Sequence, residues 1–420
     1  MSVRSFLYAH PALRRMAVRL RDRLQKRQYR RRTAGVIPTE PKRYLFCAYA
    51  GKSFACSPKA LYEVLREDPD PDLVFVWAFQ EPEKHSALAA QERRIRLVEY
   101  GSEAFRKELA RCRYWVFNTR VPSYAVKKPD QYYIQTWHGT PLKRLGYDVE
   151  QYITGADDKE SLRYSYRTDA ARYDVLLSPS PFYTEKMTSA FHLKALGKAD
   201  AVLEKGYPRN DALYAASAEK IAALRAQFGI GPGEKVILYA PTWRENALDP
   251  GKGSTYGEGI AFDLKLDPEK LLDAAGAGSR LLLRMHYFSR QTSQPDNPAG
   301  RIVDVSEYDD INDLYLISDL LITDYSSVFF DYAVLDRPIL FYMYDLDSYQ
   351  NVRDFYLPLS SLPGSVVRAE DALYAAAAAA LQAPSAVSTA FHKKFHPYPG
   401  EVSRTVWEEI RRREDSARRI

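Results

Sequence analysis

Apolar and polar positions alternate in blocks along this chain, and residues 319–343 show the pattern most plainly. An apolar run of strand length at 320–322 is followed by a polar break at 324–327. Apolar residues at helical spacing come next, and a second apolar run follows at 338–343. A strand, a short helix and another strand within so few residues predict a βαβ unit, which needs a parallel strand pair and a right-handed crossover.

The polar break falls between the carboxyl end of a strand and the amino end of a helix. Ser326 or Ser327 is expected to cap that helix. Free backbone N–H groups at a helix start attract anions, so the pattern favours a diphosphate held at Ser326 and Ser327. The alternative is a pair of serines that only caps the helix.

The same alternation of apolar runs and helical stretches recurs along most of the chain, and it is typical of open parallel sheets with helices on both faces. A segment rich in glycine and proline, G-I-G-P-G-E at 229–234, separates two sets of runs and is expected to be a linker. The predicted strands are 44–49, 73–79, 95–98, 114–117, 132–136, 175–178, 235–240, 280–285, 301–305, 319–323 and 338–343.

These patterns predict an α/β fold of two doubly wound, Rossmann-like domains that face each other across a cleft. We expect an amino-terminal domain at 35–228 and a carboxyl-terminal domain at 235–385. The flanking residues 1–34 and 386–420 are expected to form a basic amphipathic segment and a basic helical tail.

Charge is concentrated at the amino end of the chain. Residues 1–32 contain eleven Lys and Arg and one acid, Asp22, a local net charge of +10 that leaves the rest at −4 because the total is +6. Apolar residues share one helical face, with arginines around the rest, so this segment is expected to contact an anionic membrane. The alternatives are a solvated tail and a helix packed on a partner. The apolar residues are Phe6, Leu13, Ala17, Leu20 and Leu24.

The remaining composition narrows the class of protein. Basicity confined to one end argues against a nucleic-acid groove. Three cysteines without a C-x-x-C pair fit a reduced, cytosolic compartment and disfavour a zinc site. No apolar run reaches the length of a membrane span, and no signal-peptide pattern is present. We therefore expect a peripheral protein on the cytoplasmic side of the cell membrane.

Ligands in such sheets lie beyond the carboxyl ends of the strands, and polar residues gather there. One predicted strand of the first domain leads to His138, and one of the second leads to His286. A histidine on each wall beside the serine pair favours a catalytic site over two structural loop residues. The other candidates at these strand ends are Gly139, Thr140, Thr242, Arg244 and Asp324.

Weaker matches are set aside. The segment at 51–53 ends like a Walker A loop, but Phe46 occupies the place of its first glycine. Asp70 and Asp72 lie among prolines and are expected to form a surface turn. Asp345, which follows a predicted strand, is expected to be structural. No metal site is predicted.

Six segments, in order along the chain, closely resemble the CDP-glycerol glycerophosphotransferases of teichoic acid and capsule synthesis. W-H-G-T-P-L-K, Y-A-P-T-W-R and D-Y-S-S-x-x-x-D together carry most of the resemblance, which covers roughly residues 40–360. The resemblance implies the two-domain glycosyltransferase-B fold. It also implies transfer of a polyol phosphate, most simply glycerol phosphate from CDP-glycerol, to a lipid-linked acceptor with release of CMP. The segments are 132–148, 173–187, 206–211, 237–245, 281–288 and 319–343.

The resemblance also implies roles for single residues. His138 is expected to be the general base, with His286, Ser326 and Ser327 on the diphosphate. Thr242, Arg244 and Asp324 are expected near the donor. Asp331 is expected to contact either the ribose or a cationic neighbour. Gly139, Thr140 and Lys143 are expected on the acceptor side, and Arg209 is expected either to touch an anionic acceptor or to form a plain turn.

Several points stay open at this level. The donor is CDP-glycerol or CDP-ribitol, with no tightly bound cofactor and no metal demanded by the sequence. Long polymerases of the family carry an additional amino-terminal region that this sequence does not show, so addition of one unit and addition of many units per acceptor both remain as alternatives. A transferase or epimerase of the same fold that uses a UDP-sugar is the nearer rival, and a non-catalytic phosphopolymer-binding protein is the more distant one.

Overall fold

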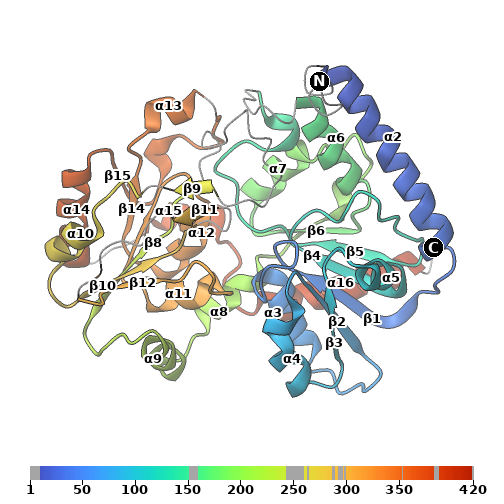
Figure 1. Cartoon of the computed structure of the whole chain (residues 1–420), viewed down its shortest axis with the longest axis horizontal. Coiled ribbons are helices and arrows are strands. Elements are labelled where there is room, and N and C mark those ends of the chain that lie inside the picture. The colour runs from blue at the N-terminus through green and yellow to red at the C-terminus, as the bar shows by residue number, and fades with distance from the viewer. Residues whose placement is uncertain are drawn as a thin grey trace.

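Two parallel sheets, each with helices on both faces, form the two lobes of the molecule (Figure 1). The computed structural model describes residues 10–150, 159–242, 260–262, 264–285, 289–291, 297, 299–351, 353–382 and 387–418. Parallel strands buried on both faces need continuous apolar runs, and the chain supplies them. The two-domain α/β architecture expected from the sequence is confirmed.

The first sheet has seven strands in the order β3-β2-β1-β4-β5-β6-β7, all parallel. The strand order reverses between β1 and β4, which makes this the topological switch point of the sheet. The strands are β1 (Glu40–Cys47), β2 (Val74–Phe79), β3 (Ile95–Glu99), β4 (Cys112–Phe117), β5 (Tyr132–Gln135), β6 (Val175–Ser178) and β7 (Val202–Glu204).

The second sheet has six parallel strands in the order β12-β10-β8-β13-β14-β15, with its switch point between β8 and β13. The edge strands β7 and β15, of three residues each, were not predicted from the apolar pattern, and neither were β9 and β11. A separate parallel pair joins β9 (Ile260–Phe262) to β11 (Ser289–Gln291). The strands of the second sheet are β8 (Lys235–Tyr239), β10 (Ser279–Leu283), β12 (Ile302–Asp304), β13 (Leu320–Thr323), β14 (Ile339–Tyr342) and β15 (Ser365–Val367).

Four apolar clusters fill the spaces between the sheets and the helices, one on each face of each sheet. In the first lobe α5 and α7 cover one face and α3 the other. In the second lobe α11 and α12 face α10 and α14 across the sheet. The helices are α2 (Pro11–Tyr29), α3 (Cys56–Leu65), α4 (Ser86–Gln91), α5 (Glu103–Arg111), α6 (Lys159–Ala170), α7 (Pro181–Ala190), α8 (Asp211–Tyr214), α9 (Ala218–Gln227), α10 (Pro268–Ala275), α11 (Ile311–Ile317), α12 (Val328–Tyr332), α13 (Leu346–Gln350), α14 (Glu370–Gln382), α15 (Thr389–Phe395) and α16 (Val402–Arg418).

The last helix returns to the first lobe (Figure 1). Val406, Trp407 and Ile410 of α16 are buried with residues of β1 and β4, and the Trp407 ring lies 5.8 Å from the Tyr44 ring. The tail is therefore helical, as expected, but its apolar face forms part of the core of the first lobe.

Helix α2 runs along the outer edge of the first lobe (Figure 1) and continues into a turn of π-helix at Arg30–Ala34. One side is held by the lobe: Tyr29 is buried, and the Ser123 hydroxyl donates to the buried Asp22 carboxylate at 3.2 Å. The apolar stripe faces solvent instead, because Leu20 and Leu24 are each 58% exposed. Phe6, the first member of the expected stripe, lies outside the described residues.

Two further findings concern the cysteines and the character of the helices. The three cysteines, Cys47, Cys56 and Cys112, are buried and unpaired. Among the helices of the described ranges, none combines the length and the apolar character that crossing a bilayer requires.

The docking of α16 depends on one buried carboxylate, Glu414, and this leads to a prediction. Its oxygens accept a 2.5 Å bond from the Tyr114 hydroxyl and a 2.8 Å bond from Arg113 Nε. Glu414→Ala leaves both donors without that acceptor, so we expect the free energy of unfolding to fall by about 3–5 kcal/mol in urea denaturation.

The matched control is Glu67→Ala. Glu67 belongs to the first lobe and forms an exposed ion pair with Arg404 of α16, which this change removes. We expect this change to cost less than about 1 kcal/mol. Equal losses for the two variants would contradict the role assigned to Glu414.

Candidate active site

The carboxyl edges of the two sheets carry most of the polar residues singled out in the sequence. Loops leave the first sheet after β1, β4 and β5, and they leave the second sheet after β8 and β13. In both sheets these loops include the two that border the switch point, where strand-end loops diverge and a ligand is accommodated.

His138 lies just beyond β5, and its ring is oriented by the neighbouring strand. Its Nδ1 lies 2.6 Å from the backbone oxygen of Asn118, the first residue after β4. A carbonyl oxygen only accepts, so in the neutral ring Nδ1 carries the proton and Nε2 holds the free lone pair. The His138 ring also stacks on Trp137, with ring centroids 4.7 Å apart, and contacts Tyr49 edge-on at 5.8 Å.

Burial lowers the pKa of His138 to about 4, and the positive charges of Arg209 and Arg120 act in the same direction. The hydrogen bond to Asn118 raises the pKa but is the smaller effect. The ring is therefore neutral at physiological pH, with Nε2 able to accept a proton.

Residues with strained backbone dihedrals cluster around His138. Of the seven non-glycine residues with positive φ in the described ranges, Tyr49, Ala50, Cys56 and Trp137 lie at the carboxyl edge of the first sheet. Left-handed backbone costs a non-glycine residue about 1–3 kcal/mol, and such strain is concentrated at functional sites. The strain supports a functional assignment for the loops after β1 and β5.

Ser326 and Ser327 lie between β13 and α12, as expected, but the predicted cap is wrong. Ser327 occupies the cap position with φ −75° and ψ −3°, and its hydroxyl makes no capping bond. A capping side chain needs an extended backbone to reach the N–H groups of the next turn, whereas Ser327 already has helical dihedrals.

The Ser327 hydroxyl instead lies against Gly139, the residue after His138. A Cβ added to Gly139 would come within 2.5 Å of Ser327 Oγ and 3.1 Å of Ser327 Cβ, so any larger residue would displace the Ser327 side chain. This contact brings together the histidine loop of the first lobe and the serine loop of the second. The two motifs, far apart in the sequence, thus form one site.

Asp324 and Thr242 connect the two loops at the second switch point. Asp324 is buried, and its Oδ1 accepts from the Thr242 N–H at 2.7 Å and from the Tyr325 N–H at 2.6 Å. These bonds indicate that Asp324 stabilises the conformation of the loops after β8 and β13. Arg244 and His286, the other residues expected on this wall, lie outside the described residues.

Arg209 and Asp331 form an ion pair where the lobes meet. Arg209 Nη2 lies 2.7 and 3.0 Å from the two carboxylate oxygens of Asp331, and both side chains are buried. Of the two partners expected for Asp331, the structure supplies the cationic neighbour. The alternative in which Arg209 faces an acceptor is not supported, because its charge is directed at Asp331 within the interface.

The remaining acceptor-side candidates are positioned by the segment after His138. Thr140 is buried, and Lys143 Nζ donates to the Tyr349 hydroxyl of the second lobe at 3.2 Å. Asn118, which orients His138, was not predicted. Its place directly after a predicted strand was the available signal, but an asparagine in no motif drew no attention.

The residues set aside in the sequence have structural partners. Asp70 and Asp72 both contact Lys42 Nζ, at 2.7 and 3.1 Å, and the Tyr325 hydroxyl donates to Asp345 at 3.1 Å. Throughout the ranges that the structure describes, no group of three or more His, Cys, Asp or Glu residues could hold a metal ion.

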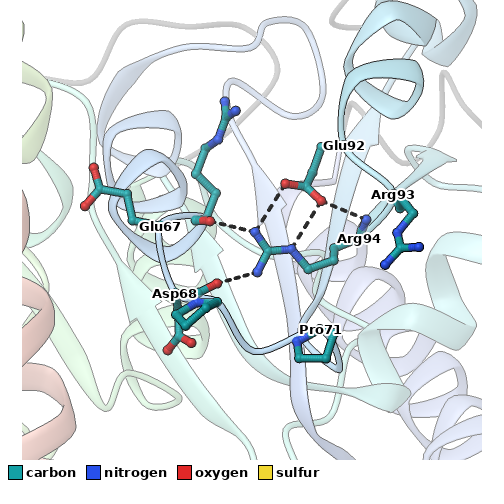
Figure 2. A pocket seen from close by; sticks show the side chains of 8 residues that line it. Glu67, Asp68, Pro71, Glu92, Arg93 and Arg94 are labelled. Carbon is teal, nitrogen blue, oxygen red and sulfur yellow. Dashed lines mark hydrogen bonds and ion pairs between the residues drawn. The ribbon is translucent and has the colours of Figure 1, made fainter.

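A shallow pocket beside the Asp70 turn lies at the opposite, amino edge of the first sheet. Figure 2 shows Arg94 occupying it, bonded to the Glu92 carboxylate and to the Asp68 carbonyl. The groups that line the pocket bond to one another and thereby stabilise the turn. It is separate from the edge that carries His138.

Comparisons with known proteins point the same way as the geometry. The family model described as CDP-Glycerol:Poly(glycerophosphate) glycerophosphotransferase matches residues 29–411. A teichoic acid poly(glycerol phosphate) polymerase of Bacillus spizizenii is 36% identical over 342 residues, which cover 80% of this chain and 83% of that protein. A teichoic acid glycerol-phosphate transferase of Staphylococcus aureus is 38% identical over 333 residues, 78% of this chain and 81% of the relative.

One relative is much longer, and solved structures agree in fold. The match to a teichoic acid poly(glycerol phosphate) polymerase of Staphylococcus epidermidis covers 78% of this chain and 44% of that protein. A histidine-to-asparagine variant of the wall teichoic acid polymerase TagF, soaked with CDPG, superposes with a TM-score of 0.80 at 30% identity. That superposition covers 99% of this chain and 100% of the TagF chain.

The buried ion pair between the lobes gives the next prediction. Asp331→Leu leaves the Arg209 guanidinium buried opposite an apolar side chain, and Arg209→Met leaves the carboxylate in the same state. Each single change is expected to cost about 3–5 kcal/mol in urea denaturation.

Combined in one chain, the two changes replace both charges with apolar groups. The double variant is therefore expected to be more stable than either single variant. Additive losses in the double variant would contradict a direct pair.

Proposed function

Since the chain belongs to the CDP-glycerol:poly(glycerophosphate) glycerophosphotransferase family, we propose that it transfers glycerol phosphate from CDP-glycerol to a terminal hydroxyl of a growing glycerol phosphate polymer. The acceptor oxygen forms a bond to the β-phosphorus, the bond from that phosphorus to the bridging oxygen breaks, and CMP leaves. The observation that supports this most is the contact between the His138 loop and the serine loop.

His138 acts as the general base in this reaction. Its Nε2 takes the proton of the attacking hydroxyl, while the Asn118 carbonyl holds the other ring nitrogen. With its pKa depressed, the ring is unprotonated and available as a base at neutral pH, although the lower basicity reduces the driving force for proton transfer. General base catalysis of this kind contributes about 10²–10⁴ in rate.

The second lobe binds the diphosphate. Ser326 and Ser327 offer hydroxyl groups and backbone N–H groups at the strand end next to the histidine loop, and the Thr242 loop lies beside them through Asp324. His286 and Arg244 are assigned the charge-assisted bonds to the phosphates by resemblance alone. Phosphoryl transfer depends mainly on positioning and charge neutralisation, which such groups provide.

The acceptor is proposed to be membrane-bound and lipid-linked, on the cytoplasmic face. Helix α2 offers exposed Leu13, Met16, Leu20 and Leu24 between arginines, as an interfacial helix requires. Its other side is held by Asp22 and Tyr29, so the stripe is presented outward from the first lobe.

The prediction for the base is a selective loss of turnover. His138→Ala should lower CMP release from CDP-glycerol by about 10²–10⁴. Donor affinity by calorimetric titration should change less than about twofold, because the phosphate contacts lie on the other lobe. The control is His392→Ala, which should remain active. His392 lies on α15 and bonds to Asp336.

The pH profile provides a second reading of the same group. The base form predominates above the pKa of about 4, so kcat/KM should be flat between pH 5 and 8 and fall only in more acidic solution. An acid limb near pH 6.5 that disappears in His138→Ala would show a solvated histidine and contradict the buried base. Release of UDP from a UDP-sugar in place of CMP would select the rival sugar chemistry.

Membrane binding is tested with vesicles. The protein should sediment with vesicles containing anionic phosphatidylglycerol, less so at high salt. Leu20→Ser with Leu24→Ser should weaken binding at least tenfold, because each leucine contributes about 1.5–3 kcal/mol when buried. Val366→Ser, which changes an exposed apolar residue of the second lobe, should bind normally. Unchanged binding of the double variant would remove α2 from the proposal.

A further inference from the structure

The segment that follows His138 does not stay with the first lobe. Residues 140–148, here called the strap, extend onto the second lobe, where Lys143 pairs with Phe355 in an antiparallel bridge. The Arg144 N–H donates to the Asp354 carbonyl at 2.9 Å, and the Tyr356 N–H donates to the Leu142 carbonyl at 2.8 Å. The strap therefore adds a short strand to the second lobe.

Side chains anchor the strap at the same place. Leu142 is 1% exposed and belongs to the apolar core of the second lobe. Lys143 Nζ bonds to the Tyr349 hydroxyl, and the Tyr349 ring stacks on Tyr325 with centroids 3.7 Å apart. Tyr325 directly precedes Ser326, so a continuous chain of contacts joins the base loop to the serine loop.

Tyr356 closes the arrangement with its hydroxyl. It accepts from the Leu145 N–H at 3.3 Å and donates to Asp148 Oδ2 at 2.5 Å. The other oxygen of Asp148 accepts from Ser189 Oγ of α7, in the first lobe, at 2.5 Å. Burial, and next the bond to Asp148, raise the pKa of Tyr356, so the hydroxyl stays protonated as a donor.

Chain length makes this anchoring consequential. Only three peptide units separate Gly139 from Leu142, and three residues of extended chain span about 10 Å at most. Gly139 therefore stays within about 10 Å of Leu142, which ties the His138 loop to the second lobe while Leu142 remains buried. The strap therefore limits how far the His138 loop can lie from the second lobe.

We infer that Tyr356 is a positioning residue for phosphoryl transfer: through Leu145 and Asp148 it holds the strap so that the His138 loop stays in register with the donor-binding lobe. The inference rests on the proposed function for its kinetic consequence. A misplacement of about 1 Å can lower a rate about 10²-fold, so one hydroxyl in the strap is sufficient to affect turnover.

The experiment compares Tyr356→Phe with Tyr374→Phe. Tyr374 is a matched control because its hydroxyl also accepts from a backbone N–H, that of Asp267 at 2.7 Å, and donates to a carboxylate, that of Glu370, but on α14. Tyr356→Phe should lower kcat about 10- to 100-fold with the affinity for CDP-glycerol changed less than about twofold. Tyr374→Phe should keep the wild-type kcat.

Hydrogen exchange read by mass spectrometry tests the strap without any substrate. Peptides covering 140–148 and 353–357 should exchange faster in Tyr356→Phe, and those of the first sheet should not. Asp148→Asn, which retains an oxygen to accept from Tyr356, should keep more activity than Asp148→Ala.

CMP release tests the proposed function, and hydrogen exchange tests the strap independently of it. Wild-type protein that releases no CMP would end the proposed function, whereas the exchange result would still support or contradict the strap. Exchange and kcat in Tyr356→Phe equal to those of Tyr374→Phe would overturn the inference. Global unfolding of Tyr356→Phe would show in every peptide, and the Asp148 pair then decides: equal activities of Asp148→Asn and Asp148→Ala would also overturn it.

Discussion

The close approach of Gly139 to Ser327 is the constraint on which the site depends. Each residue follows a strand of a different sheet, and a Cβ on Gly139 would displace the Ser327 side chain. His138 and Ser326 are the chain neighbours of this contact, so the histidine loop and the serine loop lie side by side. Neither lobe contains both parts.

Other interactions of the interface serve to maintain that approach. The Arg209 and Asp331 pair joins the lobes, and the Asn312 side-chain amide adds a bond to the Arg209 carbonyl at 2.5 Å. Lys59 and Asp310 form another ion pair between the lobes at 2.7 Å. Together with the strap, these bonds hold the lobes through several independent contacts.

The strand ends and the position of His138 could be predicted from the sequence, whereas the serine conformation and the role of Asn118 could not. The run at 320–322 and the break at 324–327 predicted a strand end beside a helix, because burial on both faces of a parallel strand demands an uninterrupted apolar run. His138 was placed correctly because it follows such a run. The serine cap failed because the backbone dihedrals of Ser327 depend on its packing, and Asn118 was overlooked because its contribution is a backbone carbonyl, which any residue carries.

The sequence by itself determined most of the strands, the order of the two sheets along the chain, the family resemblance and the basic, amphipathic pattern of α2, since each depends on local periodicity or on contiguous residues. Only the tertiary structure decided which partners meet. Arg209 and Asp331 are 122 residues apart, and Lys143 lies 206 residues before Tyr349. Local hydrogen bonding and burial specify the elements, but contacts over such separations arise only when the lobes pack, and that packing joins the histidine loop to the second lobe.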